Sequence, residues 1–342
     1  MCRRRRAIRF QGVSDQTGHR RAATAAAALF FLVGVIVLAW NIPLPLIAYS
    51  PGPVSDAAEA VVVDGAPTFP PEGELVMLTV TGQDLNLFEA LVAGVDPTVD
   101  VLARQAVRQP DETDEDYRRR NLQLMDESTA TAITVALRHV GVEEAPQSVF
   151  ITGYAADTPA GQVLEIGDRI TGLDATDIAT TEDLAEAMAD NAPGDVVPIA
   201  VVRNGEEMQY EIELAALEEE AGRPFIGIFV RSLPYWIDIN SGIVGGPSAG
   251  LMYSLAIIEV LTEGDMTSGH VIAGTGTVDT EGNVGAIGGV RQKVVAAEAA
   301  GAEYMFVPIN NHESALTAPR GEMELIPVET VQDALDFMET LG

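Results

Sequence analysis

Two residues in this 342-residue sequence have types and settings that could support hydrolytic chemistry. Ser248 lies in Gly245-Gly246-Pro247-Ser248-Ala249-Gly250, immediately before an apolar run. Lys293 is the only lysine, because the other 19 of the 20 basic residues are arginines. Arginine keeps its proton in proteins, whereas a buried lysine can lose it. The leading hypothesis is therefore a serine nucleophile with a lysine as its general base.

The residues around Ser248 are typical of the start of a helix. Pro247 is a residue type favoured in the first helical turn, and the apolar run from Leu251 to Leu261 follows it. Backbone N–H groups in that turn have no partner within the helix, so they can stabilise an oxyanion. Gly246 and Ala249 flank the Pro-Ser pair and are its candidate supporting residues. The alternative is that Ser248 only caps the helix.

Lys293 follows a Gly288-Gly289 turn and falls in the first turn of a helix expected over Val290–Ala300. The positive end of the helix dipole and burial both disfavour a cation there. To act as a base near neutral pH, the amine needs a pKa lowered by about three, which costs roughly 4 kcal/mol. The alternative is an ordinary surface lysine.

Strands and helices alternate around these two residues, which predicts an α/β or α+β domain over residues 217–342. The first residues of this range, 217–221, form an acidic linker. The expected elements include a Gly-rich hairpin beginning at Val271–Thr275, a buried strand at Tyr304–Pro308 and a final amphipathic helix at Val331–Leu341.

The sequence pattern changes in residues 141–216, where short predicted strands are separated by glycine-containing turns. The order of strand, Pro-Ala-Gly, Gly-Asp, helix, Pro-Gly-Asp and strand resembles that of a PDZ domain. The resemblance implies a β-rich fold that binds peptide C-termini in a groove beside the helix at Thr181–Asn191. Both Gly141 and Phe225–Ile228 are candidates for the carboxylate-binding loop. The alternative is that this region serves only as a spacer.

The N-terminal part of the sequence is typical of a membrane anchor. Residues 1–21 contain seven arginines and predict a basic cytoplasmic tail. The next 19 residues, 22–40, contain no charge, and we expect a transmembrane segment within 22–49 that places the rest of the chain outside the cytoplasm. A cleaved signal peptide is the alternative. For residues 50–140 we expect a mixed α/β region that ends in a long helix from about Thr113 to His139.

Composition excludes several classes of partner. The formal charge is −31, and the chain after residue 21 has 13 basic residues against 50 acidic ones, so we expect no nucleic-acid partner. An acidic, lysine-poor surface is also consistent with salt adaptation. Cys2 is the only cysteine, so disulfides do not define the compartment. The four histidines lack metal-ligand spacing, and we expect no metal.

The segments around both candidate residues resemble the proteolytic domain of Lon proteases. The similar motifs are Gly246-Pro247-Ser248-Ala249-Gly250, Ala273-Gly274-Thr275-Gly276, Gly282-Asn283-Val284 and Ile287-Gly288-Gly289-Val290-Arg291-Gln292-Lys293. The resemblance implies that Ser248 is the nucleophile, Lys293 its base and Thr275 a residue that holds the lysine. It also implies a hexameric ring. The sequence has Gly245 where that family usually has an acidic residue.

Together these features predict a membrane-anchored, PDZ-containing Lon-like serine endopeptidase with a Ser-Lys dyad. Its expected substrates are unfolded or membrane-proximal proteins. No G-x-x-x-x-G-K-[ST] motif occurs in the sequence, so we expect neither ATP nor another cofactor to be needed. One rival is an α/β-hydrolase that uses Ser248, Asp279 and His312, because Gly246–Gly250 also fits G-x-S-x-G. The other rival is a membrane-tethered PDZ scaffold without catalytic activity.

Overall fold

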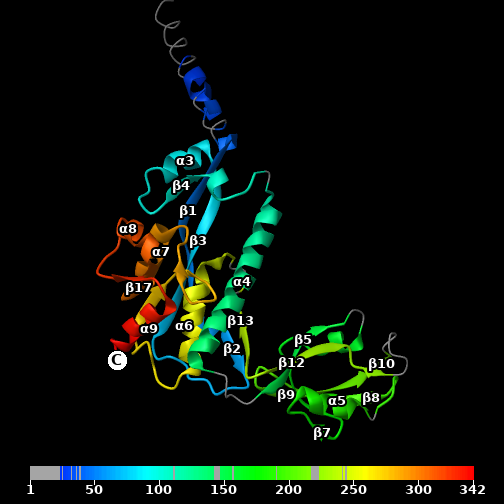
Figure 1. The fold of residues 1–342 in the computed structure, drawn as a ribbon. Coiled ribbons are helices and arrows are strands. Elements are labelled where there is room, and N and C mark those ends of the chain that lie inside the picture. The colour runs from blue at the N-terminus through cyan, green and yellow to red at the C-terminus, as the bar shows by residue number, and fades with distance from the viewer. Residues whose placement is uncertain are drawn as a thin grey trace, which may run out of the picture. The chain divides into compact units, whose positions relative to one another are not determined.

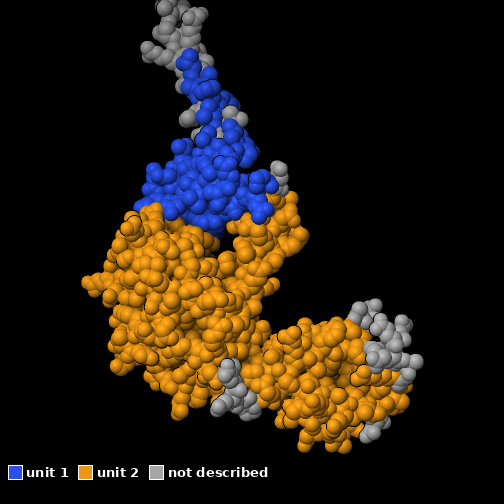
Figure 2. Space-filling model, viewed as in Figure 1, with its two compact units in different colours: residues 1–50, 81–111 blue, residues 51–80, 112–342 orange. Residues whose placement is uncertain are grey.

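The computed structural model forms two compact units, residues 1–50 with 81–111 and residues 51–80 with 112–342 (Figure 2). The basic tail at 1–21, including Cys2, and the acidic linker at 217–221 lie outside the described residues. The residues that the structure describes are 24, 26–31, 33–35, 37, 40–110, 112–141, 147–155, 158–189, 191–216, 223–240, 242 and 245–342.

Outside the N-terminal apolar segment, the first unit combines strand residues with one short helix, α3 (Leu87–Ala93). Strand β1 (Pro43–Asp56) pairs antiparallel with β4 (Asp100–Ala103), from Leu46 opposite Ala103 to Tyr49 opposite Asp100. Helix α3 follows strand β3 (Glu74–Asn86), and a 3₁₀ turn, η1 (Arg104–Ala106), follows β4. Strand β3 and helix α3 are directly consecutive, without a loop between them. A capping box between Asn86 and Glu89 fixes the start of α3.

The N-terminal apolar segment is helical at its described residues between 24 and 41. Among the described residues, the structure contains no helix that is both long and apolar enough to cross a bilayer. The expected segment also extended too far, because residues 43–49 belong to strand β1. Pro43 and Pro45 directly follow the end of the helix. They are compatible with a strand because they lie outside the stretch that pairs with β4.

A parallel arrangement of strands forms the centre of the second unit. Its strands are β3, β14 (Val271–Gly274), β17 (Tyr304–Pro308) and β18 (Glu324–Val328). Residues of β3 pair with β14, β14 pairs with β17, and β17 pairs with β18, each in parallel. Helices that connect or follow these strands can therefore begin at the same carboxyl edge of the sheet.

Helices cover both faces of this sheet, so the unit has three layers (Figure 1). Side chains alternate along the strands: Leu75 and Met77 face one core, whereas Val76 and Leu78 face the other. The first core contains α2 (Ala57–Ala60), α4 (Asp114–Val140), α6 (Gly250–Leu261) and α9 (Val331–Glu339). The second contains α7 (Val290–Ala299) and α8 (Ile309–Ala315).

Most of the predicted 50–140 region and the predicted proteolytic domain share one compact unit of the structure. Strand β2 (Val61–Asp64) pairs with β13 (Trp236–Ile239), and α4 shares the first core with α6. Apolar positions along α4, such as Ala132 and Val135, are buried there, so the long predicted helix is part of the same domain. The sequence alone does not indicate that α4 and β13 belong to one domain, because the PDZ-like region is inserted between them.

The PDZ-like region, residues 147–233, has its own sheet and core. Its strands β12, β5, β6, β8 and β9 pair in that order, all antiparallel, and β7 (Thr176–Asp177) also pairs with β6. They span Ser148–Tyr154 (β5), Arg169–Leu173 (β6), Val196–Arg203 (β8), Glu206–Glu213 (β9) and Ile228–Leu233 (β12). Shorter elements are η3 (Pro159–Gln162), α5 (Thr181–Ala189), β10 (Ala215–Ala216) and β11 (Pro224–Phe225). The sheet extends beyond the predicted end at residue 216, because β12 pairs with β5 at its edge.

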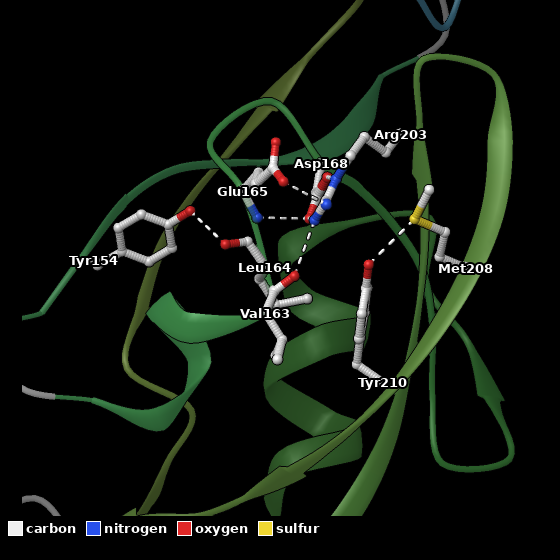
Figure 3. Close-up of polar contacts among 8 residues, drawn as sticks. All are labelled: Tyr154, Val163, Leu164, Glu165, Asp168, Arg203, Met208 and Tyr210. Atoms are coloured by element: carbon white, nitrogen blue, oxygen red, sulfur yellow. Dashed lines mark hydrogen bonds and ion pairs between the residues drawn. The ribbon is translucent and has the colours of Figure 1, made fainter.

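A largely buried ion pair joins the end of β8 to the loop before β6 in the PDZ-like region (Figure 3). The Arg203 guanidinium donates to both carboxylate oxygens of Asp168, at 2.6 and 2.7 Å, and to Glu165. The Asp168 side chain is buried and also accepts from the backbone N–H of Glu165. Such a bidentate pair is geometrically demanding, which gives the Gly-Asp motif at 167–168 a structural role.

Candidate active site

The sequence places Ser248 in a sharp turn at the start of α6. A 3₁₀ turn, η4 (Pro247–Ala249), leads directly into the helix, as the proline and glycines predicted. Gly246 precedes it with a φ of 100°, in the region that favours glycine. Ala249 is buried, whereas Ser248 is half-buried. The Ser248 hydroxyl therefore lies at an accessible helix N-terminus above an apolar helix.

Helix α4 supports this turn from the side. The N–H of Gly246 donates to the carbonyl oxygen of Asn121 at 2.8 Å, and the Ser128 hydroxyl donates to the carbonyl oxygen of Pro247 at 3.0 Å. A Cβ at Gly245 would lie 2.9 Å from the Cβ of Asn121. This close approach gives a physical reason for glycine at 245 instead of an acidic residue.

Asn121 and Ser128 are positioning residues that no local sequence pattern indicates. They lie on α4, more than 100 positions before Ser248, with the PDZ-like region in between. A serine and an asparagine on a long polar helix gave no local signal of this role. The contact becomes visible only when α4 and α6 pack in one core.

The structure brings Ser248, Lys293 and Thr275 together in one hydrogen-bonded cluster. The Lys293 Nζ donates to the Ser248 Oγ at 2.7 Å and to the Thr275 Oγ1 at 2.8 Å. The Thr275 hydroxyl in turn donates to the carbonyl oxygen of Ser248 at 3.1 Å. Thr275 thus contacts both the Lys293 amine and the Ser248 backbone.

The fold explains why residues so far apart in the sequence meet. Thr275 comes directly after β14, at the carboxyl end of a parallel strand. Helices α6 and α7 begin at this edge but pack in different cores, on opposite faces of the sheet. Lys293, in the first turn of α7, therefore reaches Ser248, in the turn before α6, across the end of β14.

Burial makes a substantial fraction of the Lys293 amine neutral near pH 7. The residue is 1% exposed, and this desolvation lowers its pKa from 10.5 to about 7. Among the ion pairs identified in the described part of the chain, none involves Lys293. A neutral amine at 2.7 Å from a hydroxyl is placed to accept its proton.

Backbone groups around Ser248 limit where an oxyanion can bind. The N–H of Leu251 donates to the carbonyl oxygen of Gly276 at 3.1 Å, and the N–H of Gly276 donates to the carbonyl oxygen of Ser248 at 3.0 Å. The Leu251 N–H is therefore already hydrogen-bonded within the protein and is not a candidate donor to an oxyanion. The preceding N–H groups of the turn, including that of Ala249, are the candidates for stabilising a tetrahedral intermediate.

The geometry disfavours a Ser-Asp-His arrangement. The Asp279 carboxylate accepts hydrogen bonds within its own turn, from the Asn283 side chain at 2.8 Å and from the backbone N–H groups of Asn283 and Glu281. This turn joins the short strands β15 (Thr277–Val278) and β16 (Val284–Gly285). His312 lies on α8, whose core is the one opposite α6. The group in contact with the Ser248 hydroxyl is Lys293.

The PDZ-like region contains a groove of about 410 Å³ between α5 and β12. Leu184, Ala185 and Met188 line it from the helix, and Phe225–Ile228 line it on the other side. Of the two candidate carboxylate-binding segments, only Phe225–Ile228 is at this groove. Gly141 instead ends α4 with a φ of 75°. The groove is lined mainly by apolar side chains, which suits the side chains of an extended peptide.

Comparison with known proteins now decides the family. Residues 127–340 match the model of the Lon protease (S16) C-terminal proteolytic domain. The chain belongs to this family. Membership places the chain among the serine-type peptidases, and the matched residues include Ser248, Thr275 and Lys293. The match also contains the PDZ-like region and the second half of α4, in agreement with an insertion into one proteolytic domain.

Individual Lon proteases match part of the chain. The Lon protease of Mesomycoplasma hyopneumoniae is 28% identical over 203 residues, which are 58% of this chain and 21% of that protein. The Lon protease of Phenylobacterium zucineum is 30% identical over 156 residues, 43% of this chain and 19% of that protein. The chain thus spans about a fifth of the length of these curated relatives.

Among solved structures, the PDZ domain of the SdrC-like protein from Listeria monocytogenes is similar to part of the chain. It is 29% identical and covers 24% of this chain and 86% of that domain, with a TM-score of 0.23. The PDZ domain of the SdrC-like protein from Listeria innocua is 26% identical, covering 25% of this chain and 93% of that domain, also with a TM-score of 0.23.

Proposed function

We propose that this Lon-family protein is a serine endopeptidase that uses a Ser248–Lys293 dyad and does not require ATP. The observation that carries the proposal is the 2.7 Å contact between the Lys293 amine and the Ser248 hydroxyl. The lowered pKa of Lys293 supports its role as a base. The lack of a nucleotide-binding P-loop motif in the sequence supports ATP independence.

The reaction would proceed through an acyl-enzyme. Neutral Lys293 accepts the hydroxyl proton as the Ser248 Oγ attacks the peptide carbonyl carbon, and backbone N–H groups of the η4 turn stabilise the resulting oxyanion. Protonated Lys293 then gives the proton to the departing amine. Water, activated by the same lysine, hydrolyses the ester and restores both residues.

A serine-reactive phosphonate probe tests the nucleophile. We expect the probe to label wild type and to leave Ser248→Ala unlabelled, because only the hydroxyl beside Lys293 is activated. Ser314→Ala, which changes an exposed serine on α8, is the matched control and should be labelled like wild type. Labelling of Ser248→Ala at the wild-type level would favour the non-catalytic scaffold.

The remaining parts of the proposal concern where the enzyme works and on what. The uncharged segment 22–40, preceded by seven arginines, supports a single membrane anchor with the catalytic part outside the cytoplasm. Substrates would be unfolded or membrane-proximal proteins, whose C-termini bind the groove beside α5. Membership of the Lon family supports assembly into a homo-oligomeric ring.

Filling the groove should abolish peptide binding without affecting the dyad. Ala185 is an exposed α5 residue that lines the groove, so Ala185→Trp places a large ring where the peptide would lie. We expect at least about tenfold weaker binding of a fluorescent decapeptide with an apolar C-terminal residue, measured by anisotropy.

The neighbouring substitution Glu186→Trp provides the control, since Glu186 is on the same helix but does not line the groove. It should bind the peptide like wild type. Amidation of the peptide C-terminus should weaken binding as strongly as Ala185→Trp. Equal affinity for the free and amidated peptides would contradict recognition of a C-terminus.

A further inference from the structure

Helix α3 presents apolar side chains where a surface helix normally presents polar ones. Five large apolar residues of α3 and the turn after it are exposed, including Leu91 at 67% and Val95 at 82%. The full set is Leu87, Phe88, Leu91, Val92 and Val95. Contiguous exposed apolar surface usually marks an interaction site.

These residues form one face of the helix because of their spacing. Phe88, Leu91, Val92 and Val95 are related by steps of three and four, which align on a helix. The opposite face is occupied: Ala93 is buried and Ala90 is partly buried, in a small core with Ala48 and Leu85. The large apolar residues therefore face away from the protein, and small alanines face towards it.

The apolar face of α3 is continuous with the N-terminal apolar segment. Trp40, the last residue of the uncharged run 22–40, stacks on Phe88 with ring centroids 5.4 Å apart. Both residues belong to the same unit of the structure. Trp is enriched where a membrane-spanning segment crosses the headgroup layer, and this contact places α3 at the level of Trp40.

The acidic side chains closest to α3 in the sequence already form ion pairs or hydrogen bonds within the protein. Asp84 is paired with Arg104 and Arg108, and Glu89 forms the capping box with Asn86. The Asp96 carboxylate accepts from both the hydroxyl and the N–H of Thr98, which lowers its pKa. The apolar face itself includes no ionisable side chain, so its approach to headgroups and acyl chains would not require desolvation of a charge on that face.

We propose that α3 lies in the membrane interface, with Phe88, Leu91, Val92 and Val95 immersed among lipid headgroups and upper acyl chains. The occupant of this face is the bilayer that the adjacent segment enters. The inference rests on the membrane anchoring proposed above and adds a second, peripheral contact. Amphipathic helices bind in this manner, with their apolar face at the boundary between headgroups and acyl chains.

Site-specific fluorescence in vesicles tests this contact. The full chain with Cys2→Ser receives one new cysteine, Leu91→Cys or Val95→Cys, which is labelled with an environment-sensitive nitrobenzoxadiazole dye. The protein is reconstituted into phosphatidylcholine–phosphatidylglycerol vesicles, with or without acyl-chain nitroxide lipids. The control position is Val196→Cys on β8, which is 55% exposed in the PDZ-like region.

We expect blue-shifted emission at both α3 positions and about twofold or greater quenching by the nitroxide lipids. The dye at position 196 should show neither effect. Emission at 91 and 95 that matches position 196 would overturn the proposal. A blue shift without nitroxide quenching would also overturn it, because a protein partner or second copy would then cover the face.

Flotation of the same samples separates the two proposals. If the chain floats with the vesicles but the α3 dyes stay in water, the anchor stands and the interfacial helix is rejected. If the chain does not float, the anchor itself is rejected, and the α3 proposal with it. Because the labelled positions are exposed, the dye should not disturb folding.

Discussion

Lys293→Arg is expected to lower the rate of peptide cleavage by about 10³-fold or more, because general-base catalysis is lost. Arginine keeps a positive charge at the same position but cannot accept the Ser248 proton. The measurement is kcat for a fluorogenic peptide, together with labelling by the serine-reactive probe. Wild-type activity should rise with pH through about 7, since only the neutral form of Lys293 is a base.

His312→Ala is the discriminating control for this prediction. His312 is the residue that an α/β-hydrolase mechanism would need, but it lies on α8 and Lys293 contacts the serine. The substitution should leave kcat near the wild-type value. An active Lys293→Arg together with an inactive His312→Ala would reject the Ser-Lys mechanism in favour of the Ser-Asp-His one.

Lys293→Met is expected to stabilise the folded protein at neutral pH while abolishing activity. The pKa of Lys293 is lowered from 10.5 in the unfolded chain to about 7 in the folded state. Between these values the unfolded chain binds a proton that the folded chain does not, so stability rises with pH across this window. Below about pH 7 the folded state carries the full free-energy cost of burying the charged Lys293 amine, which is on the order of 5 kcal/mol.

Methionine has a similar shape and no charge to desolvate, but it loses the contacts with Ser248 and Thr275. We therefore expect a net gain of about 2 kcal/mol at pH 7, measured from the urea midpoint of wild type and variant. The gain should shrink as the pH approaches 10. A difference that does not change with pH would mean that the folded state leaves the Lys293 pKa unshifted.

Local sequence patterns predicted those parts of the candidate active site that depend only on neighbouring residues. Pro247 and its flanking glycines specify a helix start, and a lone lysine after Gly289 specifies a buried first-turn amine. Both appear where expected. Thr275 could be identified only through the family resemblance, because a threonine after a short strand has no chemical signature of its own.

Long-range pairing accounts for what could not be predicted. Nothing within Glu74–Asn86 indicates that this strand pairs with β14, almost 200 residues later, and nothing in Ser128 indicates that its hydroxyl holds Pro247. The same applies to β12, which completes the PDZ-like sheet although it lies beyond the predicted end of that region at residue 216. These features depend on which apolar faces meet in the folded chain.

The burial of Lys293 also defines how this protein responds to amine chemistry. Apart from the N-terminal amine, the chain has one primary amine, and it is 1% exposed. Acylating reagents and amine-directed cross-linkers therefore find almost no target on the folded domain. Any lysine acylation that does occur falls on Lys293, the base of the proposed dyad, and is therefore expected to inactivate the enzyme.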